Sequence, residues 1–262
     1  MLALIAGTGA LPREIVSCVS DEPLVCAMAG SEPDQVSPHL TFRIEELGTF
    51  ILYLKEKGVT ELCMAGSVKR PPVDPTAIDA ATMPLVPIIQ AAIGSGDDGA
   101  LRAMIGIFEK AGLSVRAAQD IAPGLLMEPG VPTDVQPGEL DKADAARGAE
   151  IVAAMAVADT GQACAVRGRQ ALALEGIFGT DWMLKSLEER PDGQGGILYK
   201  APKPGQELRA DLPTIGPDTV ERAGKAGLGG IVLQAGGVIV LEQEAVIAAC
   251  NRLNMFLWLR EG

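Results

Sequence analysis

Short apolar runs alternate with helix-like segments along the chain, and this alternation restricts the fold more than any other feature. Residues 2–6 form an apolar run that ends in Gly7-Thr8-Gly9, and residues 11–20 then show helical spacing of apolar side chains. Further strand-like runs at residues 23–28, 60–65 and 113–115 alternate with helical stretches at residues 46–57 and 100–111. Such alternation predicts a parallel, doubly wound sheet, so we expect a Rossmann-like N-terminal domain.

The alternation breaks between Pro123 and Pro137, where prolines and glycines follow each other with little charge. The apolar side chains in this stretch predict that it packs against the protein. We therefore expect the Rossmann-like domain at residues 1–130 and a second α/β domain with a mixed sheet at residues 131–262. In the second domain the pattern predicts helices at residues 140–158, after Thr180, and at residues 217–226 and 244–253. It predicts strands at residues 163–166, 171–174, 196–200, 231–234, 238–241 and 255–259.

Composition supports a packed protein and argues against nucleic acid as a partner. Hydrophobic residues make up 48% of the 262 residues, which is enough for a core, and aromatic residues only 3%, so the core should be mainly aliphatic. A formal net charge of −12 repels a phosphate backbone at long range, and the aromatic content is too low for base stacking. A local nest of amides, a metal ion or a few cations can still bind a phosphate ligand.

The cysteine and histidine content restricts the metal sites and catalytic triads that the chain can form. None of the five cysteines is in a CxxC pair, so we interpret them as small buried residues in a reducing compartment. His39 is the single histidine of the chain. It argues against a zinc site of the usual kind and against a catalytic triad based on histidine. The first residues lack a basic leader, and no apolar stretch reaches about 20 residues, so we expect a cytoplasmic protein without a membrane span.

Two glycine-containing loops follow predicted strands of the first domain. Gly9, Ala10 and Leu11 stand between a strand and a helix, where an anion can approach the backbone. Pro12 replaces the third glycine of a dinucleotide fingerprint, so a nucleotide pocket and a merely tight turn remain equal alternatives. The second loop, Gly66-Ser67-Val68-Lys69-Arg70, presents two cations at a strand end, which suits a diphosphate; the alternative is a solvated basic loop.

Carboxylates gather in three other segments. Asp97 and Asp98 stand at a predicted helix start, where capping is the favoured reading and a magnesium site the alternative. Glu175 leaves the end of an apolar strand, where a carboxylate needs a partner, and Thr180 and Asp181 follow at a helix start, where Thr180 would serve as the cap. Residues 200–218 form a loop stiffened by prolines and rich in charged side chains, which suits a charged substrate.

At these motifs the chain resembles the LpxI-type UDP-2,3-diacylglucosamine pyrophosphatases of lipid A biosynthesis. The resemblance covers nearly the whole length, and its most specific parts are Glu175-Gly176-x-x-Gly179-Thr180-Asp181 and residues 203–216, Lys-Pro-x-Gln-x-x-Arg-x-Asp-Leu-Pro-Thr-Ile-Gly. It is carried further by Ile5-Ala6-Gly7-x-Gly9-Ala10-Leu11-Pro12, Ala65-Gly66-x-Val68-x-Arg70-Pro71, Gly96-Asp97-Asp98 and Asp159-x-Gly161-Gln162-Ala163. Two positions depart from the pattern: Phe178 replaces an expected acid, and Gln234 an expected glutamate.

The resemblance implies a two-domain hydrolase that cuts the diphosphate to UMP and 2,3-diacylglucosamine 1-phosphate with Mg²⁺ or Mn²⁺. It implies a lipid substrate held between the domains, and we expect residues 123–137 to line an apolar groove for the acyl chains. We expect Asp211, Asp181 and Glu175 to be catalytic and to bind the metal. The expected substrate-binding residues are Gly9, Ala10, Leu11, Gly66, Ser67, Val68, Arg70, Asp97, Asp98, Gln162, Thr180, Lys203, Gln206, Arg209 and Thr214, with Lys203 and Arg209 as phosphate clamps.

The chemistry agrees with the composition, because carboxylate oxygens select Mg²⁺ or Mn²⁺ in a chain with one histidine. The expected partners are the lipid nucleotide, a second copy in a homodimer, and the inner membrane surface in transient contact. Two alternatives stay open: a nucleotide-sugar oxidoreductase, and a non-catalytic carrier of a nucleotide sugar or lipid. Metal-stimulated release of UMP would distinguish the hydrolase from both.

Overall fold

The computed structural model describes residues 1–69, 72–94, 96–191 and 193–262, and the chain divides into two compact units. Unit 1 comprises Met1–Pro123 and the short segment Glu207–Asp211, and unit 2 comprises Gly124–Gln206 and Leu212–Gly262. The boundary expected after residue 130 falls a little inside unit 2. Nothing in the sequence pattern assigns Glu207–Asp211 to the first unit, so this return of the chain is a finding of the structure.

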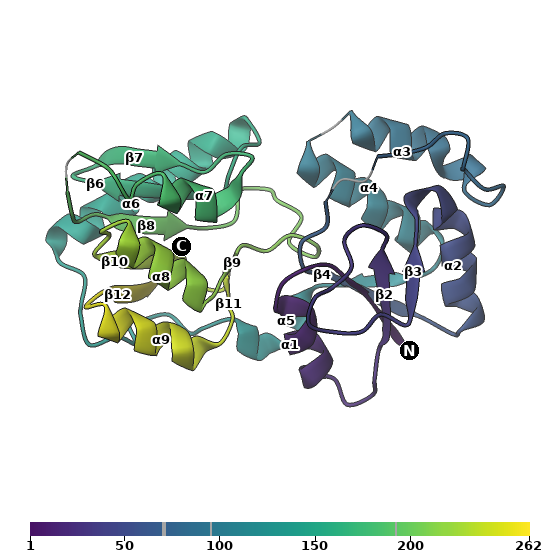
Figure 1. Ribbon diagram of the computed structural model, residues 1–262, viewed down its shortest axis with the longest axis horizontal. Coiled ribbons are helices and arrows are strands. Elements are labelled where there is room, and N and C mark those ends of the chain that lie inside the picture. The colour runs from purple at the N-terminus through teal and green to yellow at the C-terminus, as the bar shows by residue number, and fades with distance from the viewer. Residues whose placement is uncertain (70–71, 95, 192) are drawn as a thin grey trace. The chain divides into compact units, whose positions relative to one another are not determined.

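Unit 1 is built on a parallel five-stranded sheet in the order β3-β2-β1-β4-β5, as the alternating pattern predicts (Figure 1). Its strands are β1 (Leu2–Ala6), β2 (Leu24–Met28), β3 (Leu40–Phe42), β4 (Glu61–Ala65) and β5 (Ser114–Arg116). Its helices are α1 (Leu11–Cys18), α2 (Leu47–Glu56), α3 (Val86–Ile93), α4 (Asp97–Lys110) and α5 (Ala118–Ile121). Because β2 and β4 flank β1 on opposite sides, the loops after β1 and β4 leave the same sheet edge side by side.

The core of unit 1 is mainly aliphatic, with one aromatic group at its centre. The rings of Phe42 and Phe50 stack with centroids 3.8 Å apart, and Phe108 meets Phe50 edge-on at 6.5 Å. These rings join strand β3 and helices α2 and α4 in a single hydrophobic cluster. Three of the five phenylalanines of the chain therefore lie in the core of unit 1.

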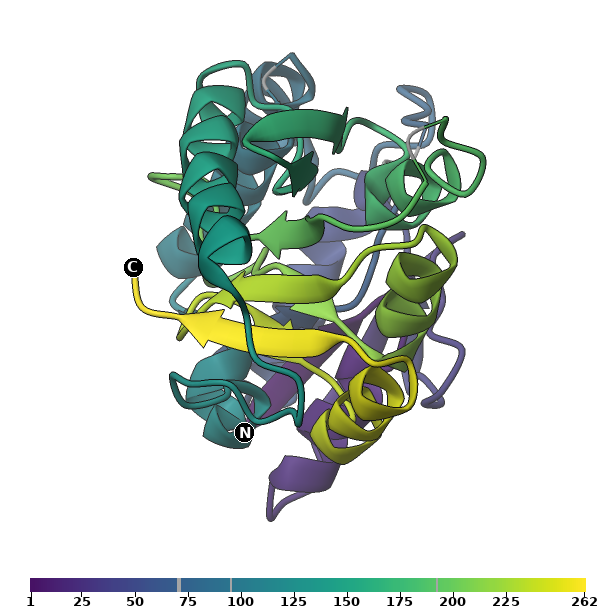
Figure 2. The same ribbon diagram turned by 90° about the vertical axis from the view of Figure 1, so that its left-hand side faces the viewer.

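Unit 2 is a three-layer arrangement around a mixed five-stranded sheet in the order β12-β10-β8-β6-β7 (Figure 2). Its strands are β6 (Ala163–Arg167), β7 (Gln170–Leu174), β8 (Ile197–Lys200), β10 (Gly230–Gln234) and β12 (Phe256–Arg260). Helix α6 (Glu139–Val157) covers one face, and α7 (Gly179–Lys185), α8 (Pro217–Lys225) and α9 (Gln243–Arg252) cover the other. Strand β6 pairs antiparallel with β7 and β8, so the predicted mixed sheet is confirmed.

Alternate strand residues separate the two faces of this sheet. On β8, Leu198 faces the cluster with α7, α8 and α9, whereas Ile197 and Tyr199 face the cluster with α6. Because Ile197, Leu198 and Tyr199 are buried in these clusters, the end of β8 is the place where a polar side chain of this strand can reach a ligand.

Two details differ from expectation. The run at residues 238–241 was expected after a turn from β10, but the strand β11 (Ile239–Val240) pairs parallel with β9 (Thr214–Ile215) in a separate two-stranded sheet. Helix α3 lies in the proline-containing apolar stretch where no helix was expected; proline is compatible there because it stands in the first turn. Strand β9, which was not predicted, has too few residues to show a recognisable periodicity.

The proline-rich stretch after residue 123 packs along unit 2, as its apolar content predicts. Gly130 bridges Leu259, and the Thr133 hydroxyl accepts a hydrogen bond from the Leu257 amide at 3.0 Å. Val131 and Val135 pack against the cluster beneath α6. These contacts fix the stretch against β12, the edge strand of the sheet.

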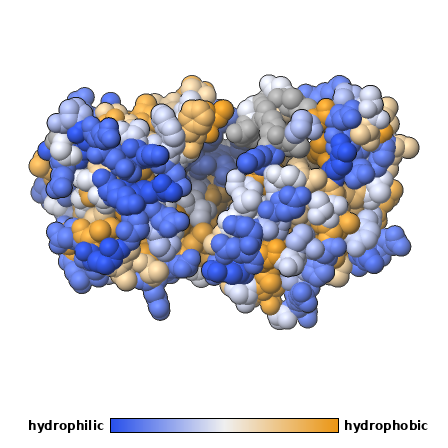
Figure 3. Space-filling model, viewed as in Figure 1, coloured by the Kyte–Doolittle hydropathy of each residue, from blue (hydrophilic) through white to orange (hydrophobic). Residues whose placement is uncertain are grey.

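Four of the five cysteines are buried, and the surface is mixed in hydropathy. Cys26, Cys63, Cys164 and Cys250 are buried free thiols, and burial raises the pKa of Cys63 to about 12; Cys18 is exposed. Hydrophilic residues cover most of the face shown in Figure 3, with apolar residues between them. Within the described ranges, no helix combines the length and apolar content that crossing a bilayer requires.

Candidate functional site

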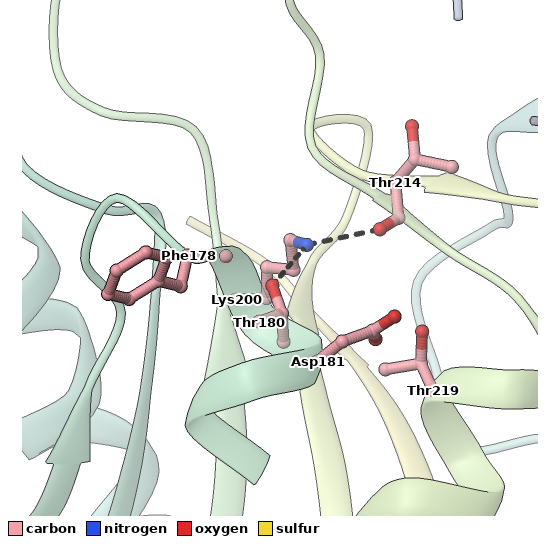
Figure 4. A pocket seen from close by; sticks show the side chains of 7 residues that line it. Phe178, Thr180, Asp181, Lys200, Thr214 and Thr219 are labelled. Carbon is pink, nitrogen blue, oxygen red and sulfur yellow. Dashed lines mark hydrogen bonds between the residues drawn. The ribbon is translucent and has the colours of Figure 1, made fainter. Parts of the chain in front are cut away.

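Unit 2 contains a small open pocket where strand β8 ends beside the first turns of α7 and α8. Its volume is about 270 Å³, near the lower end of the roughly 300–1,000 Å³ usual for ligand pockets, so it suits a phosphate-sized group better than a whole lipid. Hydroxyl groups, one ammonium and one carboxylate dominate its lining. The lining residues are Phe178, Gly179, Thr180, Asp181, Lys200, Thr214 and Thr219 (Figure 4).

Lys200 is the buried cation of this pocket. It ends strand β8 directly after three apolar residues, and only 8% of its surface is exposed. Its ammonium group donates hydrogen bonds to the Thr180 hydroxyl at 2.9 Å and to the Thr214 carbonyl oxygen at 3.1 Å. A buried ammonium group is costly without such partners, and one that faces a pocket is suited to neutralise phosphate charge.

Thr180 connects Lys200 to the buried carboxylate of Glu175. The Thr180 hydroxyl donates to one oxygen of Glu175 at 2.6 Å, and the Gln162 amide donates to the other at 2.7 Å. Glu175 thus has the partners that its position at a strand end requires. With both oxygens engaged, it orients Thr180 and fixes the backbone at Gln162.

The start of helix α7 differs from the expected capping by Thr180. Helix α7 begins at Gly179 with Phe178 at the cap position, and Gly179 has a φ of +78°, which favours glycine. Thr180 therefore lies inside the first turn, and its hydroxyl contacts Glu175 and Lys200 instead of the helix end.

Asp181 is the exposed acid of the pocket. Its side chain is 61% exposed, and one oxygen lies 3.4 Å from the Nε of Arg222 on α8. Figure 4 shows its carboxylate near Thr219, with the Lys200 ammonium group further along the same opening. The pocket therefore presents a buried cation and an exposed carboxylate to whatever enters it.

An apolar surface adjoins the pocket. Ile177 is 95% exposed, Phe178 71% and Trp182 58%, and the rings of Phe178 and Trp182 lie 5.4 Å apart. We call Ile177, Phe178 and Trp182 the apolar rim. Phe178, which replaces an expected acid, therefore contributes hydrophobic area to the rim and no charge to the pocket.

The predicted residues of the segment that follows β8 have partners within unit 2. The ammonium group of Lys203 forms an ion pair with Asp159, and its amide donates to the Gln206 side-chain oxygen at 2.8 Å. Thr214 contributes its carbonyl to Lys200, while its hydroxyl donates to the Leu212 carbonyl at 3.1 Å. Lys203 is thus already paired with a carboxylate in this structure.

In unit 1 the two predicted glycine loops lie against each other. Thr8 and Ser67 exchange backbone hydrogen bonds of 2.9 Å, and Gly7 and Gly66 allow the close approach of the two loops. Gly9, Ala10 and Leu11 follow this contact directly in the chain. The Gly9 amide donates to the Asp34 carboxylate at 2.8 Å. Arg70 lies outside the described residues, as does the side chain of Asp97.

Asp98, Arg209 and Asp211 are brought together in unit 1. The Asp98 carboxylate accepts the Glu207 amide at 2.7 Å, and the Arg209 guanidinium pairs with Glu207 and with Glu109. Asp211 is half-buried at the end of this segment. Two of the predicted catalytic acids, Glu175 and Asp181, therefore belong to unit 2, and the third, Asp211, to unit 1.

The carboxylates of the two units are the possible ligands of the predicted metal ion. Across the part of the chain that is described, no three His, Cys, Asp or Glu side chains are grouped closely enough to hold a metal ion. Among the described residues that line the pocket, Asp181 is the one carboxylate, and both oxygens of the nearby Glu175 accept hydrogen bonds. Mg²⁺ commonly uses one or two carboxylates and completes its shell with substrate phosphates and water. The donors therefore fit a magnesium ion that binds together with a diphosphate.

Sequence reasoning did not single out Lys200 or Thr219. Lys200 carried a usable signal, since a lysine directly after three apolar strand residues has to be stabilised by partners or serve a ligand. Thr219 lies in the first turn of α8, where a threonine has an ordinary role at a helix start. Only the fold shows that its side chain shares a pocket with Lys200.

Comparison with known proteins covers nearly the whole chain. Residues 1–125 match the LpxI N-terminal domain, and residues 128–258 match the LpxI C-terminal domain. The UDP-2,3-diacylglucosamine pyrophosphatase LpxI of Caulobacter vibrioides is 35% identical over an alignment of 269 positions, which covers 98% of this chain and 96% of the relative.

Proposed function

Because the chain belongs to the LpxI family, we propose that it hydrolyses the diphosphate of UDP-2,3-diacylglucosamine to UMP and 2,3-diacylglucosamine 1-phosphate in lipid A biosynthesis. The observation that carries this proposal is that the match spans both domains and almost the full length of the relative. The Lys200 pocket adds a chemical reason, since its size and charge suit a phosphoryl group.

In this proposal a phosphoryl group of the substrate enters the Lys200 pocket. A diphosphate resists hydrolysis because its negative charges repel an incoming nucleophile. The ammonium group of Lys200 would offset that charge, and burial strengthens its effect relative to a lysine in water. Glu175 would act indirectly. It would hold the Thr180 hydroxyl where this hydroxyl contacts both Lys200 and the entering group.

A divalent cation, Mg²⁺ or Mn²⁺, is part of the proposal. Asp211 and Asp181 are the residues that we expect to hold it, together with phosphate oxygens. When bound, such an ion neutralises developing charge and makes a bound water more acidic. Asp181 would then hold the ion beside a phosphoryl group in the pocket. Glu175, first expected as a third ligand, is better suited to positioning Thr180.

The first prediction is that the purified protein releases UMP from UDP-2,3-diacylglucosamine and that excess EDTA stops the release. Adding Mg²⁺ back should restore it, because the carboxylates need the ion to complete the site. UMP can be measured by chromatography against a no-enzyme control. Undiminished turnover in EDTA would contradict the metal requirement, but the proposed hydrolase activity would stand. Substrate binding without turnover under Mg²⁺ or Mn²⁺ would instead favour a carrier.

We also propose that the protein contacts the inner membrane surface from the cytoplasm while it handles a lipid-bearing substrate. The support is the apolar rim, which places Ile177, Phe178 and Trp182 in solvent beside the pocket. The homodimer and the acyl-chain groove along residues 123–137 stay predictions.

A further inference from the structure

The segment Glu207–Asp211 is a five-residue return of the chain to unit 1, and its backbone is anchored at several points. The Glu207 amide donates to the Asp98 carboxylate at 2.7 Å, and the Leu208 carbonyl accepts from the Gln119 side chain at 3.3 Å. Ala210 packs against the hydrophobic cluster of unit 1. The Asp211 amide closes a turn by donating to the Glu207 carbonyl at 3.3 Å.

Arg209 occupies the centre of these contacts. Its Nε and one terminal nitrogen donate to the two oxygens of Glu207 at 2.8 and 2.9 Å, and its other terminal nitrogen donates to Glu109 on α4 at 2.6 Å. The hydrogen bonds that Arg209 donates to Glu207 and then to Glu109 raise the pKa of Arg209, and the hydrogen bonds to Arg209 lower the pKa of Glu207. The guanidinium group is therefore bound by two carboxylates of its own unit.

This arrangement does not suit a phosphate clamp. A substrate phosphate would have to displace Glu207, Glu109 or both, and each displaced carboxylate would then repel it. Arg102 adds a second cation to the group, but it too is bound to Asp98 at 2.7 Å and lies 3.7 Å from Glu207. The charges are arranged to hold the segment on α4.

From these contacts we infer that Arg209 is a positioning residue, which fixes the Asp211 carboxylate by tying its segment to Glu109 of unit 1. The inference rests on the proposed function, because it assumes that Asp211 takes part in the reaction. Removing the Arg209–Glu109 pair should let the segment move and should lower kcat, while substrate affinity changes little.

The test uses Glu109→Gln in the full-length protein, with Glu61→Gln as the matched control. Glu61 also pairs with an arginine of unit 1, Arg116, at 2.6 Å, and its side chain is 42% exposed compared with 45% for Glu109. We expect Glu109→Gln to lower kcat about three- to fivefold, the effect of losing one partly exposed ion pair, with KM within about twofold of the parent. In the Arg209→Gln background, Glu109→Gln should cause no further loss, because both substitutions remove the same pair.

Hydrogen exchange supplies a readout that does not depend on turnover. The amides of Glu207 and Asp211 should exchange faster in Glu109→Gln than in Glu61→Gln, since both belong to the released segment. Unchanged exchange, unchanged kcat, or a raised KM at unchanged kcat would each overturn the positioning role, and the last would favour a phosphate clamp. Asp211→Ala separates the two proposals: full turnover in that variant would remove Asp211 from the reaction, whereas the exchange result would still report how the segment is held.

Discussion

A lysine at the buried end of a strand is an unfavourable residue to keep, because its ammonium group loses water when the protein folds. Lys200 is stabilised by a threonine hydroxyl and a backbone carbonyl, and it faces a pocket. Thr180 in turn depends on Glu175. Side chains that share hydrogen bonds in this way act as a unit, so the effect of changing one of them should appear in the behaviour of the others.

At this scale we predict that Lys200→Met lowers kcat/KM for UMP release by about 10²-fold or more, the loss typical of one strong electrostatic contributor. Methionine keeps the length and apolar stem of the side chain, so thermal stability should be preserved or raised. Lys142→Met is the matched control, since Lys142 is an exposed lysine of unit 2 that pairs with Glu139. If the Lys200 variant lost stability and kept its turnover, the lysine would be structural, and the pocket would lose its proposed role.

Among the elements, the turn that leads from β7 into α7 depends on a close approach by the loop after α6. A Cβ atom at Gly161 would stand 2.5 Å from the Cβ and the carbonyl oxygen of Glu175. The Gln162 amide, one residue on, is bound to the same glutamate. The position of Glu175, and through it that of Thr180, is therefore set by how closely this loop packs on the end of β7.

We predict that Gly161→Ala destabilises the protein by roughly 1–3 kcal/mol, the usual cost of forcing an extra group into a packed site. Turnover should fall as well, because the shift of Glu175 would loosen its bond to Thr180. Urea unfolding measures the stability, and Gly124→Ala serves as the control because nothing lies within 4 Å of a Cβ atom there. If the two variants were equally stable, the loop after α6 would be able to shift and accommodate the extra methyl group.

For the whole molecule, a net charge of −12 works against contact with an anionic membrane. Insertion of the apolar rim into the membrane is favoured by burial of its hydrophobic area and opposed by repulsion between the acidic protein and the anionic lipids. We therefore predict that binding to vesicles containing anionic lipid becomes stronger as salt is added, because salt screens the repulsion.

Co-sedimentation with vesicles, measured from low to high salt, tests this prediction. The double variant Ile177→Ser and Phe178→Ser should lose the binding. Val157→Ser, which changes an equally exposed apolar residue of the same unit, should keep it, since Val157 is 90% exposed and Ile177 95%. Binding that weakens with salt would point to local cations, and binding that survives the double variant would exclude the rim.

Periodicity in the sequence predicts most helices and strands of this fold, but not the contacts between residues far apart in the chain. The parallel sheet, the mixed sheet and most helices followed from periodicity, and Glu175, Thr180 and Asp181 stood out because they are close together in one motif. Lys200 meets Thr180 across 20 positions and Arg209 meets Glu109 across 100, and no spacing rule indicates pairs so far apart. Arg209 was expected to clamp phosphate because a loop arginine without its partners looks like a binding residue.

The return of Glu207–Asp211 to unit 1 means that the gene cannot be cut once to give two complete halves. A fragment ending at Pro123 would expose the face of α4 that Glu207 and Arg209 cover, together with the apolar surface beneath Ala210. The complementary fragment would carry Glu207 and Arg209 without the face of α4 that they contact. Two such pieces, expressed together, should recognise each other through this short stretch, so the chain contains a natural point for fragment complementation.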